Sequence, residues 1–120
     1  MSNLLDFELA ESAGDPKRDR LRAAFVTHLV AMTMGVSARE IAGPTRNSAK
    51  AAQGRQLAMY LSHVYFNWPL MRVGAAFDRD RSTAAYACQR VEDLRDDPAF
   101  DDALSALEAC MRAVPGRLAA

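Results

Sequence analysis

Polar side chains between residues 82 and 93 recur at a spacing that places them on one face of a helix. At about 100° per residue, the opposite face is small and apolar. Such a helix packs closely on a partner helix while its outer hydroxyl, aromatic and guanidinium groups reach base edges and phosphates of DNA. We therefore predict a DNA-reading helix; alternatively, Ser82 only caps the helix and Tyr86 packs on a neighbour. The outer residues are Ser82, Tyr86, Gln89, Arg90 and Asp93, and the inner ones are Ala84, Ala87, Cys88, Val91 and Leu94.

Charge is unevenly distributed along the chain. Lysine plus arginine and aspartate plus glutamate each number 15, so the formal net charge is zero. Residues 46–90 carry a net charge of +5, and residues 91–120 a net charge of −4. A basic middle with acidic ends is typical of a small duplex-DNA reader, although mixed charges can also merely solvate helices. The basic residues of the middle are Arg46, Lys50, Arg55, Arg72, Arg79, Arg81 and Arg90.

The motifs of several other classes of protein are missing from the sequence. Neither Gly-x-Gly-x-x-Gly nor Gly-x-x-x-x-Gly-Lys-Ser/Thr occurs, so no nucleotide cofactor and no ATPase activity are expected. Cys88 and Cys110 stand apart, which predicts buried free thiols rather than a disulfide or a zinc site. His28 and His63 have no nucleophile and acid at a recognisable spacing, so we expect neither catalysis nor a bound metal.

The chain also lacks signs of a membrane or secreted protein. No apolar run approaches the ~18 residues of a membrane-spanning helix, and the N-terminus is acidic where a signal peptide is basic. We therefore expect a cytoplasmic, nucleoid-associated protein with no membrane partner.

Apolar residues recur at helical spacing in every long segment, and no segment alternates as a strand would. The sequence predicts an all-α fold, a compact bundle of about five to six helices in one domain over residues 15–114. Residues 1–14 are expected to form a flexible acidic segment and residues 115–120 a tail. Capping residues, prolines and glycines place the helices at about 16–34, 37–41, 48–66, 69–77, 82–95 and 98–114.

The two helices at about 69–77 and 82–95 are separated by the polar turn 78–81, a helix–turn–helix pattern. The first and last helices each carry an apolar stripe that we expect to face the core. In the first helix the stripe is Leu21, Ala24, Phe25, His28, Leu29 and Met32, which makes His28 a core histidine. In the last helix it is Phe100, Ala103, Leu104, Leu107, Cys110, Met111 and Val114.

Separated blocks of the sequence resemble the C-terminal DNA-binding domain of the bacterial replication initiator DnaA. The blocks are Arg55-Gln56-Leu57-Ala58-Met59-Tyr60-Leu61, then Val73-Gly74-Ala75-Ala76-Phe77, then Arg79-Asp80-Arg81-Ser82-Thr83 and Tyr86-Ala87-Cys88. The likeness covers about residues 22–96 and implies an all-α fold whose helix-turn-helix reads double-stranded DNA in the major groove. Because no nucleotide-binding loop is present, the initiator's ATP-driven melting of an origin is not expected of this chain.

The resemblance also implies roles for individual residues. Base reading falls to Asp80, Arg81, Ser82 and Thr83, with Tyr86 facing outward beside them. Contacts to phosphates or the minor groove fall to Arg46, Lys50, Arg55, His63, Met71, Arg72, Arg79 and Arg90. Asn47 stands where the family has a minor-groove arginine, so Arg46 is the better candidate.

This sequence departs from the family pattern on the reading surface. The turn is one residue shorter, with Asp78 in place of glycine, and Arg81 and Tyr86 replace two histidines. His63 stands in for a phosphate-contacting lysine. The resemblance therefore carries over DNA binding more firmly than recognition of the initiator's own box.

We expect a sequence-specific transcription regulator, and a promoter activator because similar domains occur in activators of gene transfer agent and prophage-like clusters. One alternative is a replication-associated modulator that competes with the initiator. The other is a protein-interaction adaptor, since Leu4, Leu5, Phe7 and Leu9 lie in an acidic stretch that could form a partner helix. Double-stranded DNA is the expected partner, with RNA polymerase or another DNA-binding protein as a second one. The sequence leaves the oligomeric state open.

Overall fold

A computed structural model describes residues 15–43 and 48–114, and all regular elements in these ranges are helices. They are α2 (Pro16–Met34), α3 (Ala38–Ala42), α4 (Ala49–Tyr65), α5 (Leu70–Ala76), α6 (Arg81–Leu94) and α7 (Pro98–Arg112). The predicted all-α fold is confirmed, and each predicted helix is present. The predicted segment 1–14, the tail 115–120 and Arg46 lie outside the described residues.

Local capping explains where the helices begin. Asp15 and Asp97 each accept a hydrogen bond from a backbone N–H of the helix that follows, and a proline occupies the first helical position. Ser37 caps α3 in the same way. The prediction for α6 was one residue late, because Asp80 and not Ser82 accepts the capping bond, from the Thr83 N–H.

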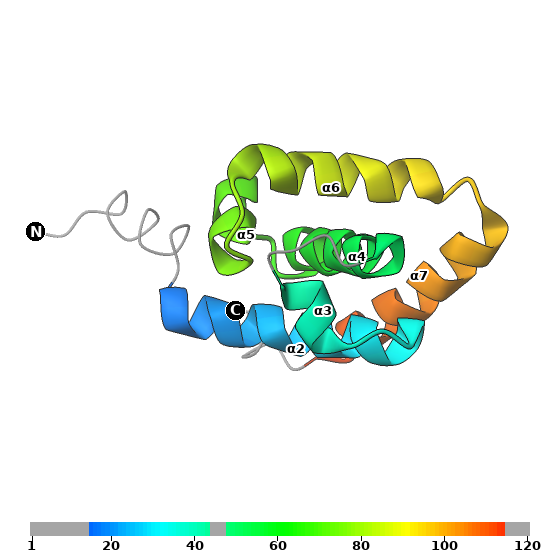
Figure 1. The fold of residues 1–120 in the computed structure, drawn as a ribbon, viewed down its shortest axis with the longest axis horizontal. Coiled ribbons are helices and arrows are strands. Elements are labelled where there is room, and N and C mark those ends of the chain that lie inside the picture. The colour runs from blue at the N-terminus through cyan, green and yellow to red at the C-terminus, as the bar shows by residue number, and fades with distance from the viewer. Residues whose placement is uncertain (1–14, 44–47, 115–120) are drawn as a thin grey trace, which may run out of the picture.

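The central helix is α4, which contacts α2, α3, α5, α6 and α7 (Figure 1). α2 and α6 lie along opposite edges of the molecule in this view, with α4 between them. Helix α4 is buried on nearly all sides over the stretch 57–62, so it forms the middle of the core. The larger buried side chains packed around it include Val26, Val30, Ile41, Trp68, Val73, Val91, Leu104 and Leu107.

The predicted orientation of α2 is wrong. Leu21, Phe25 and Met32 are 71%, 44% and 80% exposed. His28 is also exposed, with its Nδ1–H donating to the Ala24 carbonyl. The opposite face packs on the core through Ala23, Val26, Thr27, Val30 and Ala31. Both faces of α2 are apolar, so the 3.6-residue period fits either one; the face with the smaller side chains lies inward, where it allows close packing.

The cysteines are less buried than predicted. Cys110 lies on the exposed side of α7, whose buried residues are Leu104, Leu107 and Met111. Cys88 is half-buried on α6, and this burial raises the pKa of its thiol to about 11.

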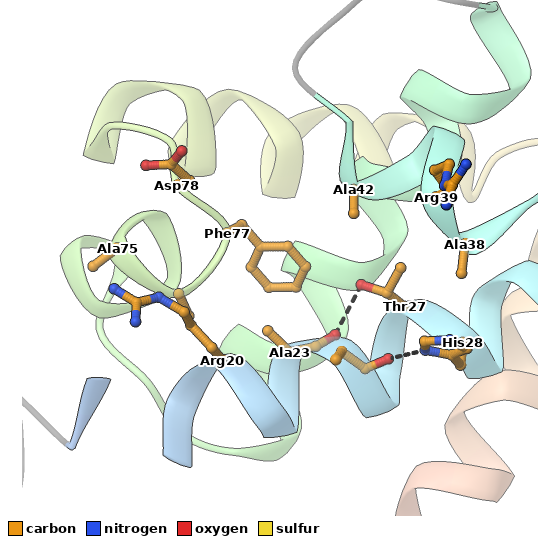
Figure 2. Close-up of a pocket in the computed structure, with 12 residues that line it drawn as sticks. Arg20, Ala23, Thr27, His28, Ala38, Arg39, Ala42, Ala75, Phe77 and Asp78 are labelled. Carbon is orange, nitrogen blue, oxygen red and sulfur yellow. Dashed lines mark hydrogen bonds between the residues drawn. The ribbon is translucent and has the colours of Figure 1, made fainter. Parts of the chain in front are cut away.

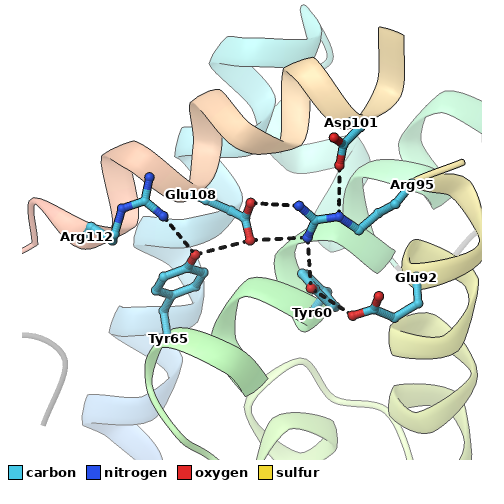
Figure 3. A network of polar contacts seen from close by, with 7 residues as sticks. All are labelled: Tyr60, Tyr65, Glu92, Arg95, Asp101, Glu108 and Arg112. Carbon is cyan, nitrogen blue, oxygen red and sulfur yellow. Dashed lines mark hydrogen bonds and ion pairs between the residues drawn. The ribbon is translucent and has the colours of Figure 1, made fainter. Parts of the chain in front are cut away.

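A polar network around Arg95 fastens α7 to α4 and α6 (Figure 3). The Arg95 guanidinium donates to Asp101 at 2.9 Å and to Glu108 at 3.0 Å. It also donates to the Tyr60 hydroxyl at 3.2 Å, and that hydroxyl donates to Glu92 at 2.9 Å. Burial, followed by Glu92, raises the pKa of Tyr60, and the bonds to Glu108 raise the pKa of Arg95. The network fixes the C-terminal end of α6 against the central helix.

The turn between α5 and α6 depends on a glycine. The Arg79 N–H donates to the Gly74 carbonyl at 2.7 Å. A Cβ atom on Gly74 would lie 2.7 Å from the Arg79 carbonyl oxygen and 2.9 Å from that of Asp80, which is closer than real contacts. The chain also passes through Asp78 at φ 57°, the left-handed region that favours glycine. Close approach at Gly74 therefore sets the angle between α5 and α6.

None of the helices in the described ranges combines the length and hydropathy needed to cross a membrane.

Gly74→Ala is expected to lower the free energy of unfolding by about 2–3 kcal/mol, because backbone atoms cannot move away as a flexible side chain could. Urea unfolding followed by circular dichroism measures it. Ala75→Ser, at the exposed neighbouring position, is the matched control and should change stability by less than ~0.5 kcal/mol. Equal stability of Gly74→Ala and the parent would contradict the tight turn.

Alkylation should distinguish the two thiols. With iodoacetamide at pH 8, we expect Cys110 to react first, because it is exposed. Cys88 should react at least ~10-fold more slowly, because burial and a raised pKa keep its thiolate scarce. Peptide mass spectrometry over time gives both rates, and similar rates would show that Cys88 is not shielded.

Candidate nucleic-acid interface

The two faces predicted for α6 are confirmed by burial. Ala84, Ala87 and Val91 are at most 1% exposed and pack inward. Tyr86 is 61% exposed, an unusual position for so large a ring. The outer surface is formed by Arg81, Ser82, Thr83, Tyr86, Gln89 and Arg90, all of them exposed. We call these six residues the reading face.

The N-terminal end of α6 is capped by the carboxylate of Asp80. Asp80 accepts from the Thr83 N–H at 2.9 Å and from the Ser82 hydroxyl at 2.8 Å. These hydrogen bonds, that of the Thr83 backbone first, lower the pKa of Asp80 and keep the capping carboxylate ionised. Arg81 follows as the first helical residue, a cation at the positive end of the helix dipole. A cation at this position does not stabilise the isolated helix. The positive charge of Arg81 and the helix dipole together attract phosphate.

Arg55 and Arg79 converge on one backbone carbonyl, that of Gly43 at the end of α3. Arg55 donates to it at 3.0 Å and to the Ile41 carbonyl at 2.7 Å, while Arg79 donates to it at 2.9 Å. Burial and the nearby Arg79 lower the pKa of Arg55. Two predicted phosphate contacts from distant parts of the sequence are thus brought together. Carbonyl oxygens do not neutralise them, so the pair remains a source of positive potential beside the turn.

Arg72 lies inside the protein, which does not fit its predicted contact with phosphate. Its Nε and Nη2 donate to the two carboxylate oxygens of Asp19 at 2.9 and 3.0 Å, and the side chain is 10% exposed. Its guanidinium carbon also lies 4.7 Å from the centre of the Trp68 ring. A buried carboxylate on α2 attracts this guanidinium more strongly than solvent does, so Arg72 connects α5 to α2.

The other predicted contacts are divided between surface and interior. Lys50, in the first turn of α4, and Met71, on α5, are exposed, the latter at 70%. His63 is half-buried, and its Nδ1–H donates to the Trp68 carbonyl at 2.7 Å. This hydrogen bond joins the end of α4 to the segment just before α5, so His63 helps to hold the loop between the two helices.

Two residues that organise the site were not found from the sequence. Asp19 is the one acidic residue in the basic run at 17–22, and Trp68 is the only tryptophan and precedes a proline. Both are nearly completely buried. An acidic residue within a basic run was the available signal for an internal ion pair.

A groove of about 670 Å³ lies beside the turn, between α2, α3 and α5 (Figure 2). Half of the residues that line it are alanines, and the Phe77 ring lies among these helices in the view. Arg20 and Arg39 are among its lining residues. Within residues 15–43 and 48–114, no group of three histidine, cysteine, aspartate or glutamate side chains is placed to hold a metal ion.

Comparison with known proteins matches this architecture to one family. The bacterial DnaA protein helix-turn-helix matches residues 24–91, more than half of the chain and the region that holds α3 to α5 and most of α6. The chain belongs to the bacterial DnaA helix-turn-helix family. Membership confirms the resemblance seen in the sequence and supports DNA binding by this chain, with double-stranded DNA as the partner.

Relatives within the DnaA family are about 30% identical to this chain. Chromosomal replication initiator protein DnaA 2 of Chlamydia pneumoniae is 31% identical over 84 residues, which is 70% of this chain and 18% of the relative. Chromosomal replication initiator protein DnaA of Tropheryma whipplei is 30% identical over 97 residues, which is 79% of this chain and 20% of the relative. The chain therefore spans about a fifth of the length of the curated relatives it matches.

Arg72→Ala should lower the free energy of unfolding by about 2–3 kcal/mol, because it leaves the Asp19 carboxylate buried without its bidentate partner. Arg22, with a nitrogen 4.0 Å from that carboxylate, limits the loss. Arg81→Ala, an exposed arginine-to-alanine change, is the matched control and should alter stability by less than ~0.5 kcal/mol. Urea unfolding compares them; equal effects would contradict an internal role for Arg72.

Proposed function

We propose that this chain is a sequence-specific double-stranded-DNA-binding protein that regulates transcription, acting as a promoter activator without catalysis or cofactor. The observation that carries the proposal is the reading face of α6. A large ring, three hydroxyl or amide side chains and two guanidinium groups are exposed there, while the opposite side of the helix packs on the core. Side chains of these types can form hydrogen bonds with base edges in the major groove.

In the proposed complex, the N-terminal half of α6 enters the major groove. Arg81 and Thr83 contact base edges near the start of the helix, and Tyr86 extends the contact one turn further on. The Ser82 hydroxyl donates its hydrogen to Asp80, so toward DNA it can act only as an acceptor while that bond is present. Met71 lies at the edge of the groove and offers an apolar contact to a thymine methyl group.

Positive groups away from α6 would then hold the phosphate backbone. Lys50 is exposed at the start of α4, and the pair Arg55 and Arg79 adds positive charge at the turn. Arg90 lies two turns along α6 from Ser82 and supplies a further cation. Arg46, which lies outside the described residues, remains the predicted minor-groove contact. Phosphate contacts of this kind fix register without reading sequence.

Activation requires a second surface. Helix α6 lies along one edge of the molecule, and α7 runs away from its C-terminal end (Figure 1). Exposed carboxylates Asp96, Asp97 and Asp102 gather before and at the start of α7. We propose that this acidic region contacts RNA polymerase or another DNA-binding protein. The resemblance to activators of gene transfer agent and prophage-like clusters supports activation as the direction of the effect.

Base-reading and backbone-contacting residues should differ in how their loss affects binding. On a duplex selected from a random pool, Arg81→Ala should weaken binding by about 1–3 kcal/mol, roughly 5–150-fold, and relax one base position. Lys50→Ala should weaken binding to all duplexes about equally. It should also reduce the slope of log binding constant against log salt concentration by about 1. Fluorescence anisotropy at several salt concentrations measures both.

Lys17→Ala, which removes an exposed cation of α2, is the control for general loss of charge and should retain the selectivity of the parent. If Arg81→Ala and Lys50→Ala both bound every duplex as the parent does, the assignment of base reading to Arg81 and of a backbone contact to Lys50 would be wrong.

A second candidate function is modulation of replication by competition with the initiator. It is favoured by the names of the relatives, which are chromosomal replication initiator proteins. Chromatin immunoprecipitation with sequencing, combined with transcripts of a deletion strain, separates the two. Peaks at promoters whose transcripts fall on deletion support activation, peaks confined to the replication origin support modulation, and an absence of discrete peaks contradicts both.

A further inference from the structure

The outward face of α2 is an apolar surface that is exposed except at the half-buried Leu29, which also packs against the core. It consists of the six residues Leu21, Ala24, Phe25, His28, Leu29 and Met32, which we call the α2 stripe. Between Leu21 and Met32, the two ends of the stripe, the only charged residue is Arg22, which is 8% exposed and lies beside Asp19. A surface helix of a monomer ordinarily places charged and polar residues here, so an uncharged stripe opposite the core indicates a protein contact.

The stripe has a small hollow beside Leu21 at one end and the highly exposed Met32 side chain at the other. Leu21, Arg22, Phe25 and Phe66 line a small hollow of about 100 Å³ with an almost entirely apolar surface. Its volume equals roughly three water molecules at ~30 Å³ each, which suits one unbranched apolar side chain. Met32, at the far end of the stripe, is such a side chain and is 80% exposed. Thioether side chains are well suited to filling irregular gaps.

We propose that two copies of this chain associate through their α2 stripes in antiparallel orientation, each inserting its Met32 into the hollow beside Leu21 of the other. The twofold axis then passes between Phe25 and His28, and the same contact forms twice, as an isologous dimer requires.

Charge favours the antiparallel orientation. Lys17 and Arg18 stand in the first turn of α2, and the last turn carries no basic residue. In an antiparallel pair these cations lie beside the C-terminal end of the other α2, the negative end of its dipole. A parallel pair would instead place the four cations together.

The size of the stripe predicts a dimer of moderate strength. From Leu21 to Met32 it is about 17 Å long at 1.5 Å per residue and about one helix wide. A strip of this length and width has a smaller area than the ~800 Å² that each partner contributes to a standard stable interface. We therefore expect the two copies to associate at micromolar concentration. Because α2 and α6 lie along opposite edges (Figure 1), pairing through α2 leaves both reading faces exposed. The inference is therefore independent of the proposed DNA function.

Sedimentation equilibrium of the full chain without DNA, in reductant so that Cys110 cannot cross-link, tests the proposal. From about 5 to 500 µM, the range expected for an interface of this size, the mass should rise from 13.1 kDa towards twice that value. Leu21→Glu and Met32→Lys should each weaken dimerisation at least ~10-fold. Ala109→Glu, which adds a charge at an exposed position of α7, is the control and should dimerise as the parent does.

A mixture of the two variants tests the orientation. In an antiparallel heterodimer, the glutamate at position 21 of one chain faces the lysine at position 32 of the other, and the second contact remains Leu21 with Met32. The equimolar mixture of Leu21→Glu and Met32→Lys should therefore dimerise more strongly than either variant alone, provided that circular dichroism shows both folded. A parent that stays monomeric, or dimers that both variants leave intact, would overturn the proposal. A mixture no stronger than its components would overturn the antiparallel arrangement.

Discussion

The ion pair of Arg72 with Asp19 is the contact on which the placement of the helix-turn-helix depends. It joins α5 to α2 through two hydrogen bonds, 53 residues apart in sequence, and Trp68 lies against the guanidinium. Burying both charges is costly, and a hydrophobic contact of the same size would stabilise as much or more. What the pair adds is geometry, because a planar guanidinium meets a carboxylate in one orientation. With α5 fixed on α2, the close approach at Gly74 then fixes α6.

The arginines that the structure describes in the basic middle segment divide into three classes with different electrostatic effects. Arg72 is neutralised by Asp19, a residue outside that segment, so it adds little to the external field. Arg55 and Arg79 are bonded to carbonyl oxygens and keep their positive charge. Arg81 and Arg90 are exposed and can contact DNA directly. A sum of charges over a sequence range therefore overstates the net positive charge of this surface by about one charge.

Sequence patterns predicted those parts of the structure that are decided locally. Helix ends followed from caps and prolines, since the capping bond forms within three residues of the cap. The faces of α6 followed from periodicity because one face is polar. The orientation of α2 could not be predicted in this way, since apolar residues occupy both faces and tertiary packing selects between them. The Arg72 pair and the Arg95 network join distant segments, so no local pattern contains them, and Arg72 was predicted to lie on the surface.

The double-sided apolar character of α2 has a physical consequence for a domain of this size. A domain of this size buries about two-thirds of the surface that its unfolded chain exposes. A helix with two apolar faces can bury only one of them in such a domain, and the exposed stripe lowers solubility unless a partner covers it. Pairing of two copies covers it and also doubles the number of reading faces in one particle. In each copy, α6 lies along the edge opposite α2, so the two reading faces would lie on opposite sides of a dimer joined through α2. The dimer would therefore bind two separate duplex segments rather than two adjacent half-sites. Once one copy has bound its segment, the effective concentration of the second segment near the other copy is raised. Two weak contacts with DNA then combine into stable binding of the dimer.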